Sequence, residues 1–291
     1  MLRIGVAVAL AALAACTTQP VGQQTRSPSP VTAPDKEPVV EEVVPFHDPN
    51  TPLDELKDGA PPRTLDPETI ADAVPRFDII KVDGNLSPYS VGGEEYHLVD
   101  DYRGFRQRGK ASWYGTKFHG RKTSNGEVYS LYSMSAAHKT LPIPLYVRVT
   151  NLDNGRQAIV RVNDRGPFHS DRIIDLSYAA AVKLGFAQKG TATVEIEVVD
   201  TDNMRTASDA SASYFLQVGA FRELDSANRL QAQLSSQLSY SVAVASSSED
   251  GLHRVRIGPF ADYPAAQAAK KVVLQRWSGG ASLVVEQGRQ G

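Results

Sequence analysis

The stretch VRVNDRGPFHSDRIIDLS, residues 160–177, decides both the fold and the candidate site of this chain. It begins as a run in which β-branched residues alternate with polar ones, the pattern of a half-buried strand. A Gly-Pro pair then forces a sharp bend directly after Asp164 and Arg165, and a second acid, Asp175, follows the bend. A carboxylate and a guanidinium are thereby held at a strand end, where functional residues are often found.

The flanking sequence predicts a mostly β domain. Asp153-Asn154-Gly155 has the composition of a tight hairpin turn, and a β-branched run with period-two alternation lies on each side of it. A third run of the same kind follows later in the chain. Several short strands favour a compact β-barrel over residues 76–200. The three runs are residues 145–149, 158–162 and 192–198.

One short helix is predicted among these strands. Residues 175–184, DLSYAAAVKL, have helical character, with Gly185 placed to end the helix. Either Asp175 or Ser177 can serve as its N-cap. Because a capping acid is a structural residue, Asp175 is left outside the predicted catalytic set.

A repeat organises residues 214–286. QVGAF at residues 217–221 has a counterpart in RIGPF at 256–260, and each strand is followed by apolar residues at helical spacing. With two further strands this gives βαββαβ, a four-stranded sheet with two helices on one face. The polar run 201–213 has the composition of a linker. The further strands are residues 240–245 and 281–285, and the helix residues expected to face the sheet are Ala227, Leu230, Leu234 and Leu238, then Ala265, Ala269, Val272 and Val273.

The N-terminus predicts export and lipid attachment. Residues 1–15 have the features of a signal peptide, since Arg3 precedes an apolar run that is shorter than the roughly 20 residues of a membrane span. The run ends in LAAC, and Cys16 is the only cysteine of the chain. This tetrapeptide resembles the lipobox of bacterial lipoproteins, in which the cysteine is diacylated, and Thr17 after it favours the outer membrane. An ordinary cleaved signal peptide with an incidental cysteine is the alternative.

The next segment predicts a disordered tether over residues 16–75. Residues 1–75 hold 5 basic and 11 acidic side chains, and 12 of the 18 prolines fall between Pro20 and Pro75. A Pro-rich, acidic and aromatic-poor segment buries too little apolar surface to fold alone. The remaining chain holds 26 basic and 22 acidic residues, a mildly positive balance that suits an anionic polymer as partner.

Three barrel motifs together resemble the rare lipoprotein A family: GKASWYGTKFHGRKTSNGE (109–127), AAHKTLP (136–142) and VNDRGPF (162–168). That family joins a double-psi β-barrel, related to barwin and expansin domains, to a SPOR domain, and the C-terminal repeat matches the SPOR pattern. The resemblance covers about residues 84–285. It implies a lytic transglycosylase that cleaves the β-1,4 bond between N-acetylmuramic acid and N-acetylglucosamine and leaves a 1,6-anhydro ring. It also implies a SPOR domain that binds peptide-stripped glycan strands at the division septum.

The same resemblance assigns catalytic roles to Asp164, Glu127 and His138. Breaking a glycosidic bond requires protonation of the leaving oxygen while the sugar ring gains oxocarbenium character. In the lytic reaction the sugar's own C6 hydroxyl attacks, so a single carboxyl group suffices as acid and base, and we assign that role to Asp164. Arg161 or Arg165 pointing at Asp164 would favour its ionised form, whereas a close Glu127 would favour the protonated form. His138 is expected to orient Asp164 or a sugar hydroxyl.

Each of these residues also has a structural interpretation. Asp164 can cap its own turn, Glu127 can be an exposed loop acid, and His138 can be a hydrogen-bonded structural residue. A metal held by His119, His138 and Asp164 is a competing hypothesis, but the chain has no HExxH or Cys-rich spacing, so neither a metal nor another cofactor is predicted. The predicted sugar contacts in the barrel are Tyr114, Thr123, Ser124, Asn125 and Arg165.

Alternation in the C-terminal strands predicts a second binding surface. Phe215, Gln217, Arg254 and Arg256 should lie on the sheet face away from the helices. Aromatic and basic residues on such a sheet also fit RNA recognition. Because an exported lipoprotein meets glycan, we predict glycan binding and no nucleic-acid partner. A plain dimerisation domain is the alternative.

These features predict a periplasm-facing outer-membrane lipoprotein that is enriched at the division septum and cuts peptide-stripped peptidoglycan. Its expected partners are glycan strands, outer-membrane lipid through Cys16, and divisome proteins. A non-catalytic glycan-binding or wall-loosening lipoprotein of expansin type is the alternative, and a purely structural septal scaffold is a third.

Overall fold

The computed structural model describes residues 43–48, 51–52, 55–168, 171–206, 209 and 212–287. The predicted signal peptide, Cys16 and the first part of the predicted tether, to residue 42, lie outside the described residues. Among the residues that are described, no helix has both the length and the apolar character needed to cross a membrane.

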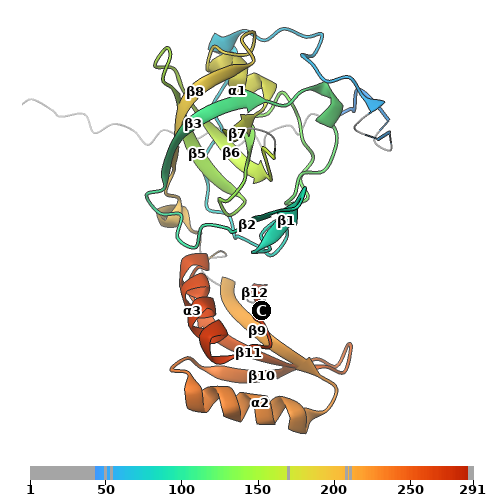
Figure 1. Cartoon of the computed structure of the whole chain (residues 1–291), viewed down its shortest axis with the longest axis vertical. Coiled ribbons are helices and arrows are strands. Elements are labelled where there is room, and N and C mark those ends of the chain that lie inside the picture. Colours follow the sequence, from blue (N-terminus) through green and yellow to red (C-terminus); the bar gives the residue numbers. More distant parts are fainter. Residues whose placement is uncertain are drawn as a thin grey trace, which may run out of the picture. The chain divides into compact units, whose positions relative to one another are not determined.

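A closed barrel forms the first half of the described chain (Figure 1). Its strands are β3 (Arg106–Trp113), β4 (Ser135–His138), β5 (Leu145–Asn151), β6 (Gln157–Asp164), β7 (Arg172–Leu176) and β8 (Thr191–Val198). Around the barrel they follow the order β3-β7-β4-β6-β5-β8. The β4 strand lies between β6, to which it is parallel, and β7, to which it is antiparallel. The predicted β-barrel is confirmed, and the bend of residues 164–167 lies at the end of β6.

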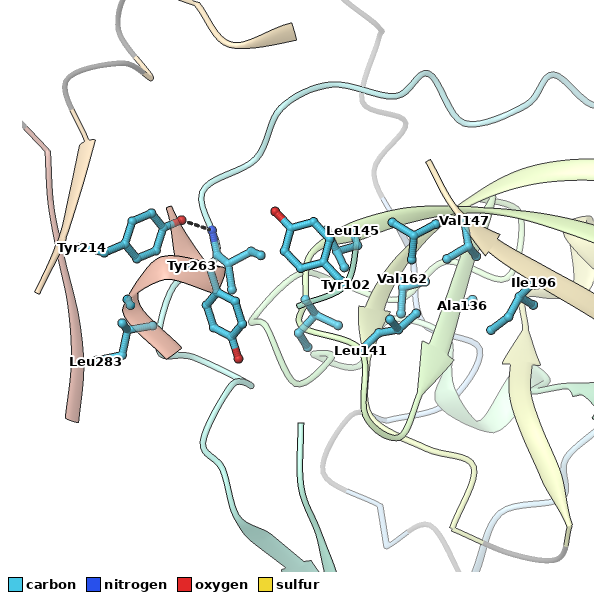
Figure 2. Close-up of a cluster of buried hydrophobic side chains, with 14 of the residues drawn as sticks. Tyr102, Ala136, Leu141, Leu145, Val147, Val162, Ile196, Tyr214, Tyr263 and Leu283 are labelled. Carbon is cyan, nitrogen blue, oxygen red and sulfur yellow. Dashed lines mark hydrogen bonds between the residues drawn. The ribbon is translucent and has the colours of Figure 1, made fainter. Parts of the chain in front are cut away.

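Small and β-branched side chains fill the barrel interior. Figure 2 shows Ala136, Val147, Val162 and Ile196, all without exposed surface, within the same apolar cluster. Burying each larger side chain stabilises the fold by about 1.5–3 kcal/mol. Alternation along β5, β6 and β8 places these residues inside, which confirms the three predicted strands.

The predicted hairpin between β5 and β6 is also confirmed. The amide of Gly155 donates to the carbonyl of Asn151 at 2.8 Å, and the amide of Asn151 donates to the carbonyl of Arg156 at 2.9 Å. Gly155 has a φ of +75°, a conformation that favours glycine.

The helix predicted within the barrel, α1 (Tyr178–Lys183), begins later than predicted. Asp175 and Leu176 belong to β7, where Leu176 is fully buried and pairs with Trp113 of β3. The hydroxyl of Ser177 accepts from the amide of Ala180 at 3.2 Å, so Ser177 is the N-cap. The prediction that Asp175 caps this helix is wrong, because barrel pairing overrides the local helical preference.

The segment before the barrel is attached to it. The amide of Ala73 donates to the carbonyl of Ile159 at 3.0 Å, and the amide of Ile159 donates to Asp72 at 3.1 Å. Asp72 also forms an ion pair with Lys183 at 2.8 Å. Residues 72 and 73, at the end of the predicted tether, therefore contact the barrel, since a sequence without periodicity still offers backbone groups to β6, and the bounds of the tether stay a prediction.

Short elements complete this half. They are the 3-10 helices η2 (Pro67–Thr69), η3 (Thr116–Phe118) and η4 (Asp202–Met204), and a hairpin of β1 (Tyr89–Val91) and β2 (Glu94–Tyr96). Gly92 and Gly93, with φ values of +60° and +85°, form the turn of that hairpin.

The second half is a four-stranded antiparallel sheet with two helices, which confirms the predicted βαββαβ order. The elements are β9 (Ala212–Phe221), α2 (Leu224–Gln237), β10 (Val242–Ser246), β11 (His253–Phe260), α3 (Tyr263–Arg276) and β12 (Ser282–Gln287). Across the sheet the order is β10-β11-β9-β12. Both helices contact β9 and β11 (Figure 1).

The two helices meet the sheet differently from each other. All four predicted residues of the α2 segment are buried, but in α3 the predicted Ala265 and Val272 are exposed. The reason is the start of α3: Asp262 caps it by accepting from the amide of Ala265 at 2.8 Å. Because α3 begins there, a different row of its side chains faces the sheet. The buried stripe includes Tyr263, Ala266, Ala269 and Val273.

Candidate functional site

A cleft of about 550 Å³ opens beside the bend of residues 164–167. Asp164 of β6 and Asp175 of β7 both line it, and both pair with Ala137 of the intervening strand β4. Neighbouring strands lie about 4.8 Å apart, which places the two backbones roughly 10 Å from each other. Asp58 also lines the cleft, which therefore holds three acidic residues, whereas Glu127, the second acid of the predicted catalytic set, is not part of its lining. Its lining consists of Asp58, Trp113, Tyr114, Lys117, Phe118, Ala137, residues 164–168, Arg172 and Asp175.

One oxygen of Asp164 takes all the hydrogen bonds found for this carboxylate. Oδ1 accepts from the amide of Ser124 at 2.9 Å, from the hydroxyl of Ser124 at 2.7 Å and from the amide of Arg165 at 2.8 Å. Within the described part of the chain, Oδ2 has no hydrogen-bond partner. Asp164 is therefore fixed through one oxygen, and the other is available to a ligand in the cleft.

The side chain of Arg165 does not face this carboxylate. Its Nε donates to the carbonyl of Gly84 at 2.8 Å, and Nη1 donates to the carbonyls of His138 at 3.1 Å and Leu141 at 2.5 Å. Nη2 donates to the side chain of Asn85 at 2.9 Å. Burial lowers the pKa of Arg165 to about 10, against the opposing effect of Tyr89, Tyr263 and Asp164. This geometry gives Arg165 a structural role, and the predicted sugar contact stays a prediction.

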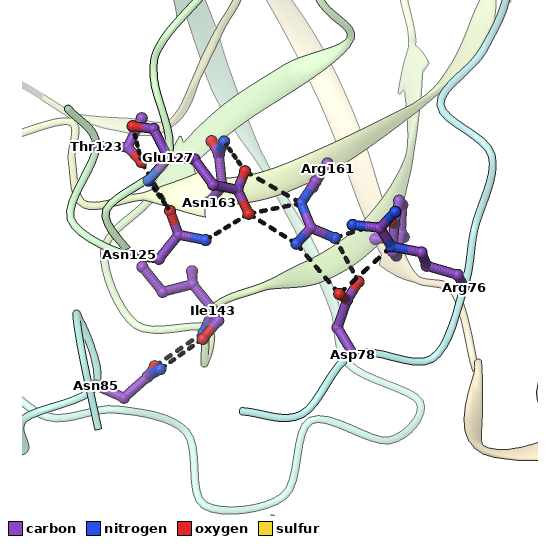
Figure 3. Close-up of polar contacts among 10 residues, drawn as sticks. Arg76, Asp78, Asn85, Thr123, Asn125, Glu127, Ile143, Arg161 and Asn163 are labelled. Carbon is purple, nitrogen blue, oxygen red and sulfur yellow. Dashed lines mark hydrogen bonds and ion pairs between the residues drawn. The ribbon is translucent and has the colours of Figure 1, made fainter. Parts of the chain in front are cut away.

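Glu127 lies in a separate polar network (Figure 3). Its carboxylate accepts from Arg161 through Nη2 at 2.8 Å, from Asn163 at 2.7 Å and from Asn125 at 2.9 Å. Burial would raise the pKa of Glu127, but these hydrogen bonds and the charge of Arg161 outweigh it and hold the pKa below the usual value. Glu127 lines a different cavity, of about 410 Å³, from the one that Asp164 lines, and its predicted catalytic role stays a prediction.

A residue before the barrel completes that network. Asp78 forms an ion pair with Arg161, and Arg76 in turn contacts Asp78 at 3.4 Å. Hydrogen bonds from Arg161 to Glu127 and Asp78 raise its pKa although burial alone would lower it. Asp78 lies outside every recognised motif and no local pattern marks it, so it could not be predicted as part of this network.

The loop between Thr123 and Glu127 connects the two sites. Thr123 donates its hydroxyl to the side chain of Asn125 at 2.7 Å and its amide to the carbonyl of Glu127 at 2.7 Å. Gly126, with a φ of +89°, allows the tight turn. Thr123 and Asn125 thus hold the loop together, while Ser124 reaches Asp164. Of the three predicted sugar contacts in this loop, Ser124 is the one bonded to the predicted acid.

His138 is buried and fully hydrogen-bonded away from Asp164. Its Nδ1 accepts from the amides of Thr140 at 3.1 Å and Leu141 at 3.0 Å, and Nε2 pairs with Gln107 at 3.0 Å. Two amide donors at Nδ1 assign the proton to Nε2. Burial, with the charges of Arg165 and Lys139, lowers the pKa of His138 to about 3. Within the described residues the ring has no hydrogen bond to Asp164, so it does not orient that carboxylate directly, and the alternative, that it orients a sugar hydroxyl, stays a prediction.

The ring of Tyr114 belongs to an aromatic cluster. It stacks on Tyr129 with centroids 4.0 Å apart and meets the edge of Phe118 at 5.7 Å. Although Tyr114 lines the cleft, only 8% of it is exposed. One face is covered by Tyr129, which leaves less of the ring for a sugar than predicted, and its role in stacking stays a prediction.

Asp175 is the residue of the cleft that sequence analysis misplaced. It accepts from the hydroxyl of Ser112 at 2.7 Å and forms an ion pair with Arg172 at 3.1 Å. Ser112 and Asp175 are paired across β3 and β7, so the barrel register brings them together. A strand assignment for residues 172–176 would have found this group.

The metal hypothesis is not supported. His119 accepts from the amide of Leu131 at 3.2 Å, and His138 and Asp164 have the separate partners given above. Within the described ranges, no three His, Cys, Asp or Glu side chains gather into a set that could hold a metal ion.

The sheet of the second half presents the predicted polar face. Phe215, Gln217, Arg254 and Arg256 are half-buried, whereas the alternate residues of β9 and β11 are buried toward the helices. Arg256 pairs with Glu286 of β12, and Arg254 pairs with Asp250. The four residues share one face, and glycan binding there stays a prediction.

Comparisons with known proteins agree with this architecture. A family model described as lytic transglycolase matches residues 106–196, and a SPOR domain model matches residues 210–285. The chain is 48% identical over 209 residues to the endolytic peptidoglycan transglycosylase RlpA of Vibrio cholerae, a match that covers 70% of this chain and 78% of that protein. It is 42% identical over 264 residues to the protein of the same name from Pseudomonas aeruginosa, covering 70% and 77%. The chain therefore belongs to the RlpA family, the rare lipoprotein A family that its barrel motifs resemble.

Proposed function

We propose that this protein is a lytic transglycosylase that cleaves the β-1,4 bond between N-acetylmuramic acid and N-acetylglucosamine in peptidoglycan. The names of its relatives support this class of reaction. The observation that carries the proposal is the carboxylate of Asp164, fixed through Oδ1 in a cleft and without a described partner at Oδ2.

Asp164 acts as both acid and base. Its Oδ2 gives a proton to the bridging oxygen as the bond from the muramic acid C1 to that oxygen breaks, and C1 gains oxocarbenium character. The C6 hydroxyl of the same sugar then attacks C1 and loses its proton to the Asp164 carboxylate. The products are a free hydroxyl on the leaving sugar and a 1,6-anhydro ring, so no water is consumed and Asp164 recovers its proton.

Arg161 and Arg165 direct their guanidinium groups at partners other than Asp164, which leaves Oδ2 of Asp164 to exchange the proton with the substrate in this proposal.

Glu127 serves the reaction from a distance. As an ionised group bound to Arg161, it holds Asn125 and the turn that presents Ser124 to Asp164. It is a positioning residue in this proposal, not a proton donor. Asp175, with Ser112 and Arg172, contributes polar groups that orient the sugar on the other side of the cleft.

The remaining parts of the chain place the enzyme. We infer that Cys16 carries lipid and anchors the protein in the outer membrane, facing the periplasm. The SPOR sheet, through Phe215, Gln217, Arg254 and Arg256, binds peptide-stripped strands at the septum and raises their local concentration at the barrel. Divisome proteins are the expected protein partners.

Product analysis tests the proposal. The full chain is incubated with purified peptidoglycan, with and without prior removal of the stem peptides by an amidase, and the released sugars are identified by mass. We expect 1,6-anhydro ends, one water lighter than hydrolysed ends, and more of them from the stripped material. Hydrated ends would identify a hydrolase, and binding without any new ends would favour the non-catalytic wall-loosening alternative.

A further inference from the structure

Three aromatic side chains form a cluster at one end of the cleft. Tyr89 of β1 and Tyr96 of β2 stack with centroids 5.3 Å apart, and Tyr96 lies 5.5 Å from Phe168. Tyr89 approaches the edge of Phe168 at 6.2 Å. All three are partly exposed, and the hairpin that carries the tyrosines lies outside the residues matched by the barrel family model. Tyr89, Tyr96 and Phe168 are called the aromatic cluster below.

The two tyrosines differ in their surroundings. Tyr89 is anchored to the barrel, because its hydroxyl donates to the carbonyl of Lys139 at 2.7 Å and its ring lies 5.7 Å from the guanidinium of Arg165. Tyr96 has no such anchor: its hydroxyl donates to Glu94 of its own strand at 2.7 Å. Tyr89 therefore supports the aromatic cluster, and Tyr96 with Phe168 forms its outer surface.

This surface continues the cleft. Phe168 lines the cleft together with Asp164, four residues before it in the chain. A polymer bound across Asp164 and leaving the cleft on this side meets Phe168 first and Tyr96 next. The apolar rings also have a polar border, formed by the hydroxyl of Tyr96 and the carboxylate of Glu94 that accepts from it at 2.7 Å.

We propose that Tyr96 and Phe168 form a saccharide-stacking subsite for a glycan strand, beyond the bond that is cut. A sugar ring has an apolar C–H face and a polar rim of hydroxyls, which matches flat rings with a polar border. Tyrosine suits such a surface because it joins an apolar body to a polar tip. The proposal rests on the proposed function, which supplies the glycan as the occupant of the cleft.

The position of the subsite determines its effect. It lies outside the reacting bond, so it holds substrate and transition state equally and changes KM more than kcat. Removing one aromatic ring should raise KM for long peptide-free strands about tenfold, which corresponds to the strength of such stacking. A short saccharide that fills only the cleft should be cut equally well by the unchanged protein and by the variant that lacks the ring.

Kinetics of full-length variants on long and short strands test this. Tyr96→Leu keeps apolar packing on Tyr89 but lacks a flat face, whereas Tyr96→Phe keeps the face and removes only the bond to Glu94. We expect a raised KM for long strands in Tyr96→Leu alone, with Tyr96→Phe and the hairpin control Val91→Ala like the unchanged protein. An unchanged KM in Tyr96→Leu, or an equal rise in Tyr96→Phe, would overturn the subsite.

A binding measurement separates this proposal from the catalytic one. The full chain with Asp164→Asn is labelled with 3-fluorotyrosine at its 11 tyrosines, and the resonance that disappears in Tyr96→Phe identifies Tyr96. We expect that resonance to shift when a peptide-free glycan oligosaccharide is added, whether or not the unchanged protein cuts glycan. A Tyr96 resonance that stays fixed while others move would contradict the subsite and leave the catalytic proposal untouched.

Discussion

Ser124 binds one oxygen of Asp164 twice, through its amide at 2.9 Å and through its hydroxyl at 2.7 Å. The hydroxyl also accepts from the amide of Arg165 at 3.2 Å, so Ser124 connects the loop 123–127 to the bend after β6. Hydrogen bonds to a charged group contribute more than bonds between neutral groups. The orientation of the proposed acid thus depends on a loop whose own shape depends on Glu127.

Replacing Ser124 tests that dependence. Ser124→Ala removes the hydroxyl and keeps the amide bond, so we expect kcat to fall about tenfold, the equivalent of one hydrogen bond to a charged group. Initial rates of anhydro-end formation measure the effect, with the exposed Ser236→Ala of α2 as the matched control. Full activity in Ser124→Ala would show that the amide alone positions Asp164.

Glu127 should act through its charge and its hydrogen bonds, not as a proton donor. Because its pKa is held below the usual value, its contribution to stability is present above about pH 4.5 and is lost as the pH falls through the lowered pKa. Glu127→Gln should lower kcat with little change in KM. Asp78→Asn weakens the ion pairs with Arg161 and Arg76 but leaves Glu127 in place, so it should cause a smaller decrease of the same kind. Between pH 5 and 8 the shape of the pH–rate profile should be unchanged in Glu127→Gln. A profile without one of its limbs would instead identify Glu127 as a catalytic acid or base.

His138 predicts a pH dependence of stability. Its folded pKa of about 3 lies below the unfolded value of about 6.5, so the unfolded chain binds a proton that the folded chain does not. Stability is therefore complete above about pH 6.5 and falls below it by at most about 1.4 kcal/mol per pH unit from this group. Urea unfolding of the unchanged protein and of His138→Gln, from pH 7 to 4, gives the free energy of unfolding of each protein as a function of pH, and the unchanged protein should lose more of it. If the free energy of unfolding fell equally steeply with decreasing pH in the two proteins, His138 would be protonated in the folded state.

Asp175 should matter for binding more than for proton transfer. Asp175→Asn keeps a group that can accept from Ser112 but weakens the ion pair with Arg172. We expect a severalfold rise in KM with residual turnover, because removing an interaction that orients the sugar weakens the ground state and the transition state alike. Complete absence of turnover with normal folding would instead make Asp175 a second essential carboxyl group.

The sequence predicted elements where local pattern and tertiary pairing agree, as in β5, β6 and the hairpin closed by Gly155. It failed at Asp175, where a helix-like run enters β7 because Leu176 completes the barrel interior. It also failed for α3, since the cap at Asp262 rotates the buried stripe away from Ala265. Motifs identified Asp164 and Glu127, but they did not show that the two residues line different cavities, because that placement arises from strand register. Asp78 and Tyr96 lie outside those motifs, and only folding brings them to the site.

The most direct test of the account is the yield of 1,6-anhydro ends from purified peptide-free glycan, measured for the unchanged full chain and for Asp164→Asn. Asparagine keeps the size of the side chain and an oxygen for Ser124 but cannot exchange the proton. The account predicts anhydro ends from the unchanged protein and none from Asp164→Asn, with equal thermal stability of the two. Undiminished anhydro ends from a folded Asp164→Asn would contradict it.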